Sequence, residues 1–289
     1  MKREDLLPLA FGGNKLRNLE FHVGAALAAG ADALVTSGRR WSNHCRLTAA
    51  AGARAGLAVH LVLSGPPVEP PGPNQQLDVL LGATVEVTSS ADRGERAAAV
   101  EAAAARLEAA GLHPYVVPVG GSGVTGALGQ VDAALELAEQ AAGEGLDLAA
   151  VVLPSATGGT HAGLLVGLRL AGVGASVEGV AVAVPSAELR PTVETLVAEL
   201  AALLGIDVAA DEVRFDDTQL GPGYGRPTAA ADEATRLLAR SEGILVDPIY
   251  TAKALAGLVA AVRAGRYDGR TIVFWHAGGT PGLFEQLST

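Results

Sequence analysis

The sequence of 289 residues predicts an open α/β fold, in which parallel strands are covered by helices on both faces. Short apolar runs alternate with longer, alanine-rich amphipathic stretches along almost the whole chain. Hydrophobic residues make up 49% of the chain, but aromatic residues only 4%, so much of the apolar content is alanine on helix faces. The length suits one large domain or two moderate ones.

The apolar runs and amphipathic stretches define the expected elements in order. Strands are expected at Ala33–Thr36, Ala58–Leu63, Thr84–Thr88, Tyr115–Val117, Ala149–Leu153, Gly179–Val184 and Thr271–Trp275. Helices are expected at Leu16–Ala29, Ser42–Ala55, Gln75–Leu81, Glu95–Ala110, Thr125–Ala142, Thr160–Ala171, Pro191–Leu204, Ala229–Glu242 and Thr251–Ala264. The proline-rich segment Ser64–Asn74 and the segment Gly221–Pro227 are expected to be loops.

Composition excludes several classes of function. A net charge of −10 and scattered basic residues oppose binding to nucleic acid. Cys45 is the single cysteine, which rules out an internal disulfide and a cysteine metal cluster, and no histidine pair has zinc-ligand spacing, so no metal is expected. No stretch reads as a membrane span or a secretory signal, and we therefore expect a cytoplasmic protein with no membrane partner.

The most informative residue is Lys15, which follows Gly12 and Gly13 at the start of an expected helix. Glycines let the backbone turn tightly and approach a ligand. Burial at such a helix entrance disfavours the ammonium form and lowers the lysine pKa, as a Schiff-base lysine requires. The alternative is an ordinary surface lysine beside a glycine pair.

The turn Ser155–Thr160, between a strand and a helix, is the strongest local candidate for a binding site. Its small residues expose successive backbone N–H groups, and the following helix N-terminus favours an anion, so the turn can hold a phosphate. It lacks the lysine of a nucleotide P-loop. The alternative is a tight turn with ordinary helix capping.

Three further segments carry polar groups at strand ends or in loops. The turn Ser37–His44 brings a hydroxyl, an amide and an imidazole together, although Ser42 alone reads as a helix cap. Tyr224 and Tyr250 offer two phenols to a cleft, although each alone is typical of packing. The run His276–Gly282 ends the last strand with glycines that leave room for a planar ring, or forms a plain turn.

Taken together, these segments resemble the fold type II pyridoxal-phosphate enzymes, in the branch of 1-aminocyclopropane-1-carboxylate (ACC) deaminase and D-cysteine desulfhydrase. The matching motifs, in the family's order from Lys2 to Phe284, are GGNKLRNLEF, TSGRRWSNHCR, SATGGTHAGL, GYGRPT, DPIYTAKALAGL and HAGGTPGLF. The resemblance implies a tryptophan synthase beta-like fold with two open, mostly parallel twisted sheets flanked by helices. It also implies pyridoxal 5'-phosphate (PLP) as cofactor.

The resemblance implies a role for each matched residue. Lys15 is the implied Schiff-base lysine and proton carrier, and Asn43 the partner of the cofactor's phenolic oxygen. The implied phosphate ligands are Thr157, Gly158, Gly159 and Thr160, and Ala277 completes the cofactor site. The implied substrate contacts are Trp41, Ser42, Asn43 and His44, with Ser42 and His44 on the carboxylate. Tyr224 and Tyr250, counted with Lys15 and Ser42 as catalytic, would face the reacting carbon atoms.

The resemblance further implies a smaller α/β domain at residues 18–121 and a larger PLP-binding domain at residues 1–17 and 122–289, with the cofactor in the cleft between them. It implies a homodimer. Relatives usually carry some tens of residues before the segment that begins here at Lys2, so an element that normally covers the larger domain or the dimer contact is expected to be missing.

Three departures from the family pattern bear on the site. Thr251 follows Tyr250 as in the desulfhydrases, where the deaminases have a glutamate near the pyridine nitrogen; this favours β-elimination over cyclopropane opening. Ala277 stands where threonine or leucine is usual, and Trp41 where glutamine is usual, which adds bulk beside Ser42.

The sequence therefore leaves three hypotheses. The leading one is a PLP-dependent lyase or deaminase that acts on a small amino acid by β-elimination, giving an oxoacid and ammonia. The second is β-replacement, another specialised transformation or an ACC deaminase-like reaction. The third is a cofactor-binding paralogue without turnover.

Overall fold

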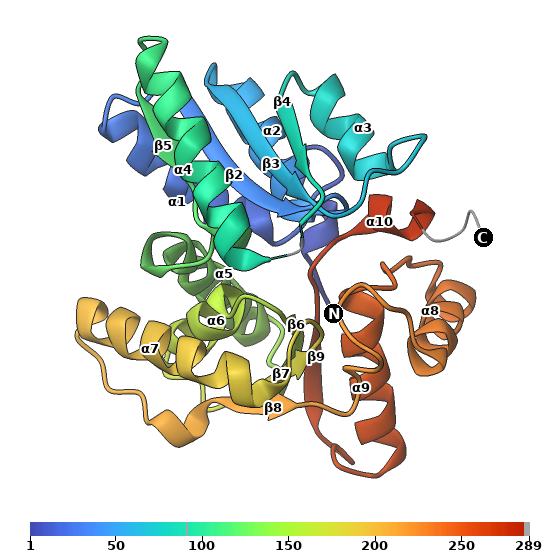
Figure 1. Ribbon diagram of the computed structural model, residues 1–289. Helices are drawn as coiled ribbons and strands as arrows, with labels where there is room; N and C mark the ends of the chain where they lie inside the picture. Colours follow the sequence, from blue (N-terminus) through green and yellow to red (C-terminus); the bar gives the residue numbers. More distant parts are fainter. Residues whose placement is uncertain (91, 286–289) are drawn as a thin grey trace.

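The computed structural model describes residues 1–90 and 92–285 and confirms the predicted α/β class (Figure 1). Two sheets lie one above the other, and every strand pair in the described residues is parallel. The strands are β1 (Lys2–Arg3), β2 (Ala33–Arg39), β3 (Ala58–Ser64), β4 (Thr84–Thr88), β5 (Pro114–Val116), β6 (Leu148–Ser155), β7 (Ser176–Ala181), β8 (Arg214–Asp216) and β9 (Thr271–His276). The α-helices are α1 (Lys15–Ala28), α2 (Asn43–Ala55), α3 (Pro73–Leu80), α4 (Arg93–Ala109), α5 (Val124–Gly143), α6 (Gly159–Leu170), α7 (Ser186–Leu204), α8 (Ala229–Glu242), α9 (Thr251–Arg263) and α10 (Thr280–Phe284).

The smaller sheet has the strand order β4-β3-β2-β5 and is covered on both faces. Side chains alternate along each strand, so Leu34 and Leu61 pack with α1 and α2 on one face. Val35 and Val62 point the other way and pack with Val100 of α4. This two-sided burial explains why β2 and β3 read as continuous apolar runs.

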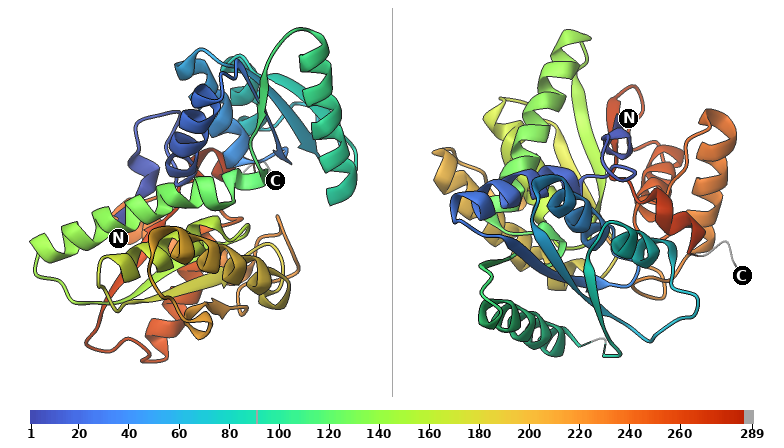
Figure 2. Two further views of the ribbon diagram at one scale, coloured as in Figure 1. Left: turned by 90° about the vertical axis from the view of Figure 1, so that its left-hand side faces the viewer. Right: turned by 90° about the horizontal axis from the view of Figure 1, so that it is seen from above.

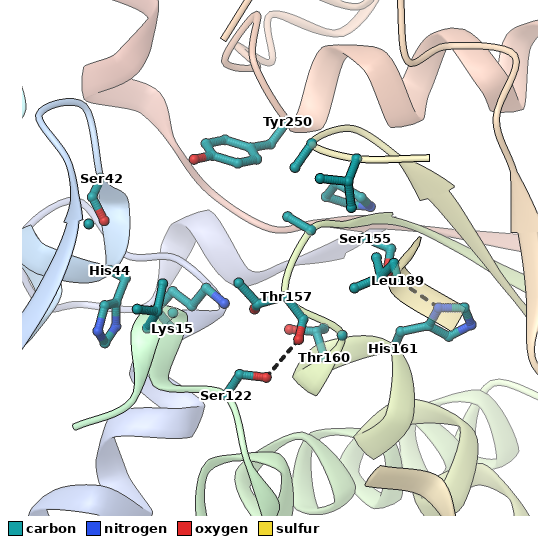
Figure 3. A pocket seen from close by; sticks show the side chains of 18 of the residues that line it. Lys15, Ser42, His44, Ser122, Ser155, Thr157, Thr160, His161, Leu189 and Tyr250 are labelled. Atoms are coloured by element: carbon teal, nitrogen blue, oxygen red, sulfur yellow. Dashed lines mark hydrogen bonds between the residues drawn. The ribbon is translucent and has the colours of Figure 1, made fainter. Parts of the chain in front are cut away.

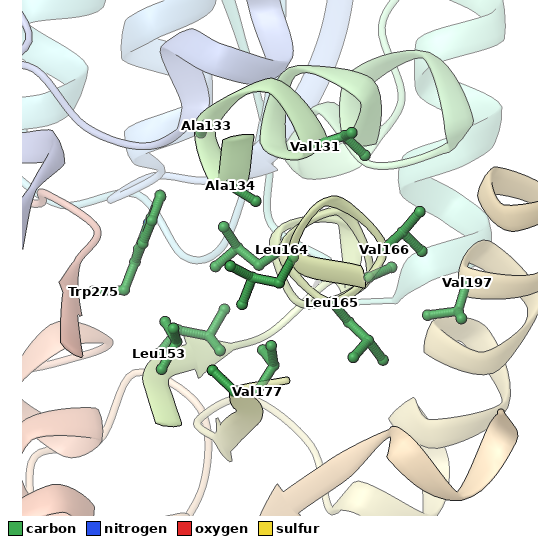
Figure 4. Packing of buried hydrophobic residues seen from close by; sticks show 14 of the residues in the cluster. Val131, Ala133, Ala134, Leu153, Leu164, Leu165, Val166, Val177, Val197 and Trp275 are labelled. Atoms are coloured by element: carbon green, nitrogen blue, oxygen red, sulfur yellow. The ribbon is translucent and has the colours of Figure 1, made fainter. Parts of the chain in front are cut away.

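The larger sheet has the order β1-β9-β6-β7-β8 and carries the main core. Helices α5, α6 and α7 cover one face, where Leu153, Val177 and Trp275 meet the apolar side of α6 (Figure 4). Helices α8 and α9 cover the opposite face, where they pack against Val180 of β7 and Phe274 of β9. Figure 2 shows these layers from two further sides. No helix in the described ranges is both long enough and apolar enough to cross a membrane.

Several predicted boundaries were wrong. Helix α7 begins at Ser186, five residues before the predicted start at Pro191. Helix α7 tolerates a proline at position 191 because the ring is exposed and only one N–H donor is lost. Burial of Leu189 and Val193 of the same helix stabilises the helical conformation. Strand β7 spans residues 176–181 instead of 179–184, since its pairing with β6 fixes the register. Strands β1 and β8 and helix α10, of two to five residues, are too short to show a periodic pattern.

Helix α1 joins the two halves of the molecule. It packs against α2 on the side of the smaller sheet and against α5 on the side of the larger one. The predicted domain boundary separates residues 18–121 from residues 1–17 and 122–289, and it cuts α1 near its start. This division stays a proposal. Residues 286–289 of the predicted larger domain lie outside the described residues.

Close packing of α6 on α5 gives a testable prediction. A Cβ atom at Gly163 would lie 2.5 Å from the backbone oxygen of Ala127, so Gly163→Ala must push the two helices apart. We expect a loss of about 1–3 kcal/mol in the free energy of unfolding, measured by urea titration. Gly24 in α1 is the matched control, since no atom lies within 4 Å of its added Cβ. Gly24→Ala should stabilise the protein by about 0.5–1 kcal/mol, and equal effects of the two substitutions would contradict this packing.

Candidate active site

A cavity of about 960 Å³ lies between the two sheets (Figure 3). It opens at the carboxyl ends of β2 and β6, where open parallel sheets bind ligands. Of the predicted site residues, those that line it are Lys15, Ser42, Asn43, His44, Thr157, Gly158, Thr160, Tyr224, Tyr250 and Ala277. Two others, Trp41 and Gly159, are not among the lining residues and lie directly behind it.

The loop before Lys15 is held in a strained shape. Ala10 and Phe11 have φ values of 44° and 66°, in a backbone region that residues other than glycine rarely adopt. The buried Arg46 guanidinium of α2 holds this loop, donating to the backbone oxygens of Ala10 at 2.7 Å and Gly12 at 3.3 Å. A cation inside α2 thus fixes the backbone that leads into the lysine.

Asn14 attaches this loop to the larger sheet. Its backbone N–H donates to the Ala277 oxygen at 2.9 Å, and its side-chain amide donates to Thr160 Oγ1 at 2.8 Å. Gln130 of α5 donates to the Asn14 backbone oxygen at 2.8 Å. These bonds join the lysine segment, the last strand turn and the first turn of α6, so their relative positions are set together.

Lys15 itself begins α1 and extends across the cavity toward Thr157, with His44 on its other side (Figure 3). A Cβ atom at Gly120 would lie 2.9 Å from Thr157 Oγ1 and 3.4 Å from Lys15 Nζ, so glycine is needed where these groups converge. The cavity leaves part of the side chain accessible, but the surrounding protein shields it from bulk water. Burial lowers the pKa of Lys15 from 10.5 to about 8.

The predicted phosphate turn follows β6 and opens α6. Gly158 has a φ of 85°, and a Cβ atom there would lie 2.8 Å from Val193, so glycine is required for both backbone and space. The first N–H groups of any helix lack an intrahelical partner, and in α6 no N-cap side chain accepts from them. The Ser122 hydroxyl donates to the Thr157 oxygen at 2.8 Å and supports the turn from the side.

The second predicted turn follows β2. Ser42 caps α2, as predicted, by accepting a hydrogen bond from the Cys45 N–H at 3.2 Å. The side chain of Asn43 accepts a hydrogen bond from Asn74 at 3.3 Å through its oxygen, which leaves its amide hydrogens to donate elsewhere. A Cβ atom at Gly38 would lie 2.6 Å from Ser42 Oγ, so the turn closes tightly over the end of the strand.

The hydrogen bonds of His44 fix its tautomer. The Thr36 hydroxyl donates to the Val117 oxygen at 2.7 Å, so at 2.9 Å from His44 Nε2 it accepts, and Nε2 carries the proton. Burial, with the nearby Lys15 charge, holds the pKa of His44 well below its usual value. The ring is therefore neutral, and its buried Nδ1 is an acceptor, which has no partner among the described groups. This arrangement does not suit the predicted contact of His44 with a carboxylate, which needs a donor.

The two predicted tyrosines meet at the cavity. Their hydroxyl groups are hydrogen-bonded to each other, and burial raises the pKa of both, so both stay protonated. Trp41 packs behind Tyr224 with ring centroids 6.0 Å apart. The buried Asp247 carboxylate orients the start of α9 by accepting the backbone N–H groups of residues 249–251 at 3.0, 2.8 and 3.0 Å.

Some site residues were not predicted. Asn18 of α1 donates to the Gly121 oxygen at 2.8 Å and is bonded to Gln130, so buried amides connect the helices beneath Lys15. Gln130 lies between Ala127 and Val131 on the buried face of α5, and its polarity on that face was a signal in the sequence. Asn14 lay within the lysine motif, but no sequence signal identified its distant partners.

The geometry suits a phosphate-bearing aldehyde cofactor. A lysine with a lowered pKa faces the cavity, a glycine turn with uncapped N–H groups lies across from it, and an amide donor stands at the side. These features fit a class: the enzymes that hold such a cofactor in a cavity between two parallel sheets.

Comparisons with known proteins identify the family. Residues 1–278 match the family described as pyridoxal-phosphate dependent enzyme. D-cysteine desulfhydrase of Salmonella choleraesuis (strain SC-B67) is 43% identical over 98% of this chain and 87% of its own length, and that of Salmonella paratyphi C (strain RKS4594) is 42% identical over the same shares. A crystal structure of an ACC deaminase homologue has a TM-score of 0.92 and 36% identity over 99% of this chain and 86% of that chain. Serine racemase from Dictyostelium discoideum, with a TM-score of 0.62 and 19% identity over 93% of this chain and 83% of that one, shows the fold alone.

The chain belongs to the pyridoxal-phosphate-dependent enzymes, in the group that contains D-cysteine desulfhydrase and ACC deaminase. The predicted fold type, cofactor and enzyme class are thereby confirmed, and the protein is a PLP-dependent lyase.

The lowered pKa of Lys15 predicts how cofactor attachment depends on pH. Only the unprotonated amine attacks the aldehyde, so the attachment rate should rise with pH and level off above about 8. At pH 7 about one amine in ten is already unprotonated. Stopped-flow absorbance of cofactor-free protein mixed with PLP, between about pH 6 and pH 10, measures the profile. A rate that keeps rising toward 10.5, the ordinary lysine value, would contradict the burial of Lys15.

Proposed function

We propose that this enzyme removes the β-substituent of a small amino acid related to D-cysteine and releases an oxoacid and ammonia. The observation that carries the proposal is Lys15, whose amine extends toward Thr157 of the phosphate turn in a cavity that both tyrosines also line. The identity to D-cysteine desulfhydrases over 98% of the chain supports the substrate class.

Different residues around Lys15 bind the cofactor and the substrate. Thr157, Gly158, Gly159 and Thr160 bind the cofactor's phosphate, and Ala277 borders the ring. Asn43 donates its free amide hydrogens to the cofactor's phenolic oxygen. When bound, PLP withdraws electrons from the α-carbon of the substrate. We assign the substrate carboxylate to Ser42, because the neutral His44 ring offers an acceptor and not a donor.

Lys15 acts as the base in this proposal. Its neutral amine takes the proton from the α-carbon, and its lowered pKa makes this possible near neutral pH. Tyr224 and Tyr250 remain protonated and can donate a hydrogen bond toward the leaving substituent. The hydroxyl of Thr251 contacts Asp247 at 2.6 Å and the Gly278 oxygen at 3.0 Å. The sequence resemblance implies a glutamate at this position in the deaminases. This difference supports elimination over ring opening.

Chemical trapping and turnover test the proposal together. Borohydride reduction of the cofactor-loaded protein should fix the cofactor on Lys15, because the other lysines, Lys2 and Lys253, are engaged with Glu136 and with the Leu220 oxygen. The expected result is a single modified peptide by mass spectrometry, together with pyruvate and ammonia from D-cysteine or β-chloroalanine. Lys15→Ala should abolish both the trapped adduct and the visible cofactor band, with an unchanged circular dichroism spectrum as control. Trapping on Lys2 or Lys253 would refute the assignment.

We also propose that the enzyme is a cytoplasmic homodimer. Large apolar side chains are exposed, among them Leu6 at 67%, Phe11 at 60% and Leu80 at 81%, and burying such groups favours association. The free, buried Cys45 suits a reducing compartment. Sedimentation velocity should give about twice the chain mass of 29.0 kDa, and a single species at that chain mass would contradict the dimer.

A further inference from the structure

One wall of the cavity is basic and has no part in the chemistry assigned so far. It consists of Arg39, Arg93 and Arg96, which line the cavity next to Tyr224. Arg39 ends β2, and the other two arginines lie in the first turn of α4. Two separate elements therefore bring three guanidinium groups to one side of the cavity.

These arginines have no carboxylate partner among the described ion pairs. Other arginines do: Arg17 pairs with Glu4, and Arg106, at the far end of α4, pairs with Glu86. Arg96 is only 9% exposed, and its bond is to the neutral hydroxyl of Ser64 at 3.1 Å. Burial and the nearby charges of Arg39 and Arg93 lower the pKa of Arg96. A buried cation beside other cations is costly unless an anion joins them.

No described ion pair joins an acidic side chain to this wall. The charge of Asp92 acts on Arg96, but this carboxylate caps α4 by accepting the Glu95 N–H at 2.9 Å. Asp247 accepts hydrogen bonds from the start of α9. Glu188 lies exposed on α7, and no described ion pair joins it to Arg39, Arg93 or Arg96. The guanidinium groups thus remain available to an anion that enters the cavity.

The basic wall stands next to the reacting end of the substrate. Ser42, assigned to the substrate carboxylate, donates its backbone N–H to the Arg39 oxygen at 2.8 Å, so both belong to one turn. The charges of Arg39 and Arg96 act on the Tyr224 hydroxyl, which is bonded to Tyr250. The arginines therefore lie on the tyrosine side of the cavity, where the β-substituent departs.

We propose that the preferred substrate carries an anionic oxyacid group on its β-carbon, a sulfonate or a phosphate, and that Arg39, Arg93 and Arg96 bind this group. The inference rests on the proposed function and names its substrate class. Guanidinium groups suit oxyanions because they donate paired hydrogen bonds in a plane.

The bonds in the elimination balance without a further oxidant or reductant. Lys15 takes the α-proton, and the electron pair of the Cα–H bond forms the Cα=Cβ bond. The bond from Cβ to the substituent breaks, and its electron pair leaves with the substituent as an anion, sulfite or phosphate. Water then hydrolyses the released enamine to the oxoacid and ammonium. The arginines stabilise the charge of the departing anion.

Matched substrates test the proposal. Cysteate and O-phosphoserine carry an anionic β-substituent, whereas cysteine and β-chloroalanine carry a neutral one, and both enantiomers of each are assayed on the cofactor-loaded enzyme. The wild type should favour the anionic pair in kcat/KM. Arg39→Gln and Arg96→Gln should each lower kcat/KM for the anionic pair by about tenfold to a hundredfold, and for β-chloroalanine by less than about threefold.

The variants have matched controls. Arg106→Gln removes a guanidinium from the same helix as Arg96 but from its exposed far end, and should change neither substrate group. Arg39→Lys keeps the charge and should restore part of the anionic activity. Thermal unfolding of each variant separates loss of folding from loss of binding, and Arg39→Gln keeps the test available if the buried Arg96 cannot be replaced.

A binding measurement separates this inference from the proposed function. Titration calorimetry compares 3-sulfopropionate with propionate, neither of which can react. The wild type should bind the sulfonate more tightly than propionate, and Arg39→Gln should lose this difference. That result supports the basic wall even if the enzyme turns over no amino acid. Absence of turnover would refute only the proposed function. Turnover of the neutral substrates only, or equal losses on both substrate groups in Arg39→Gln, would overturn the inference and leave elimination in place.

Discussion

The active site depends on the attachment of the Lys15 loop to the larger sheet through Asn14. This buried amide residue bonds at once to the turn after β9, to the first turn of α6 and to Gln130 of α5. A lysine at the start of a helix could point in many directions if that helix end were free. Here the end of the helix is fixed on three sides, so the amine and the phosphate turn keep one separation.

The same attachment explains where the strain in the chain lies. The loop from Ala10 to Gly13 must curve sharply to bring Asn14 against the Ala277 oxygen, and Gly278 stands so close that a Cβ atom there would lie 2.6 Å from the Gly13 Cα. Arg46, buried in α2 of the smaller sheet, holds the outer side of the loop. Strain beside Lys15 is therefore stabilised by contacts from both halves of the molecule.

Much of the fold was readable from the sequence. The central strands of both sheets are buried on two faces, so their apolar runs are continuous, and most helices are long enough to show their period. The edge strands β1 and β8 were not predicted, because strands of two or three residues are too short to show an alternation of apolar and polar residues. Motifs predicted Lys15, the turn at residues 157–160 and the two tyrosines as site residues, and all of them except Gly159 line the cavity. The tautomer of His44 was not predicted, because it depends on Thr36 and Val117, which reach the ring only through the sheet.

The sequence by itself determined the class of fold and the chemical groups of the candidate site, since these follow from local patterns: period, glycine turns and the residues beside them. Only the tertiary structure decided which groups meet, because hydrogen bonds and burial join residues that are far apart in the chain. In the folded chain Trp41 packs behind Tyr224, and the His44 Nδ1 atom is an acceptor. Arg39 of β2 lies near Arg96 of α4. The lowered pKa of Lys15 belongs to the same category, because it comes from the protein that encloses the amine.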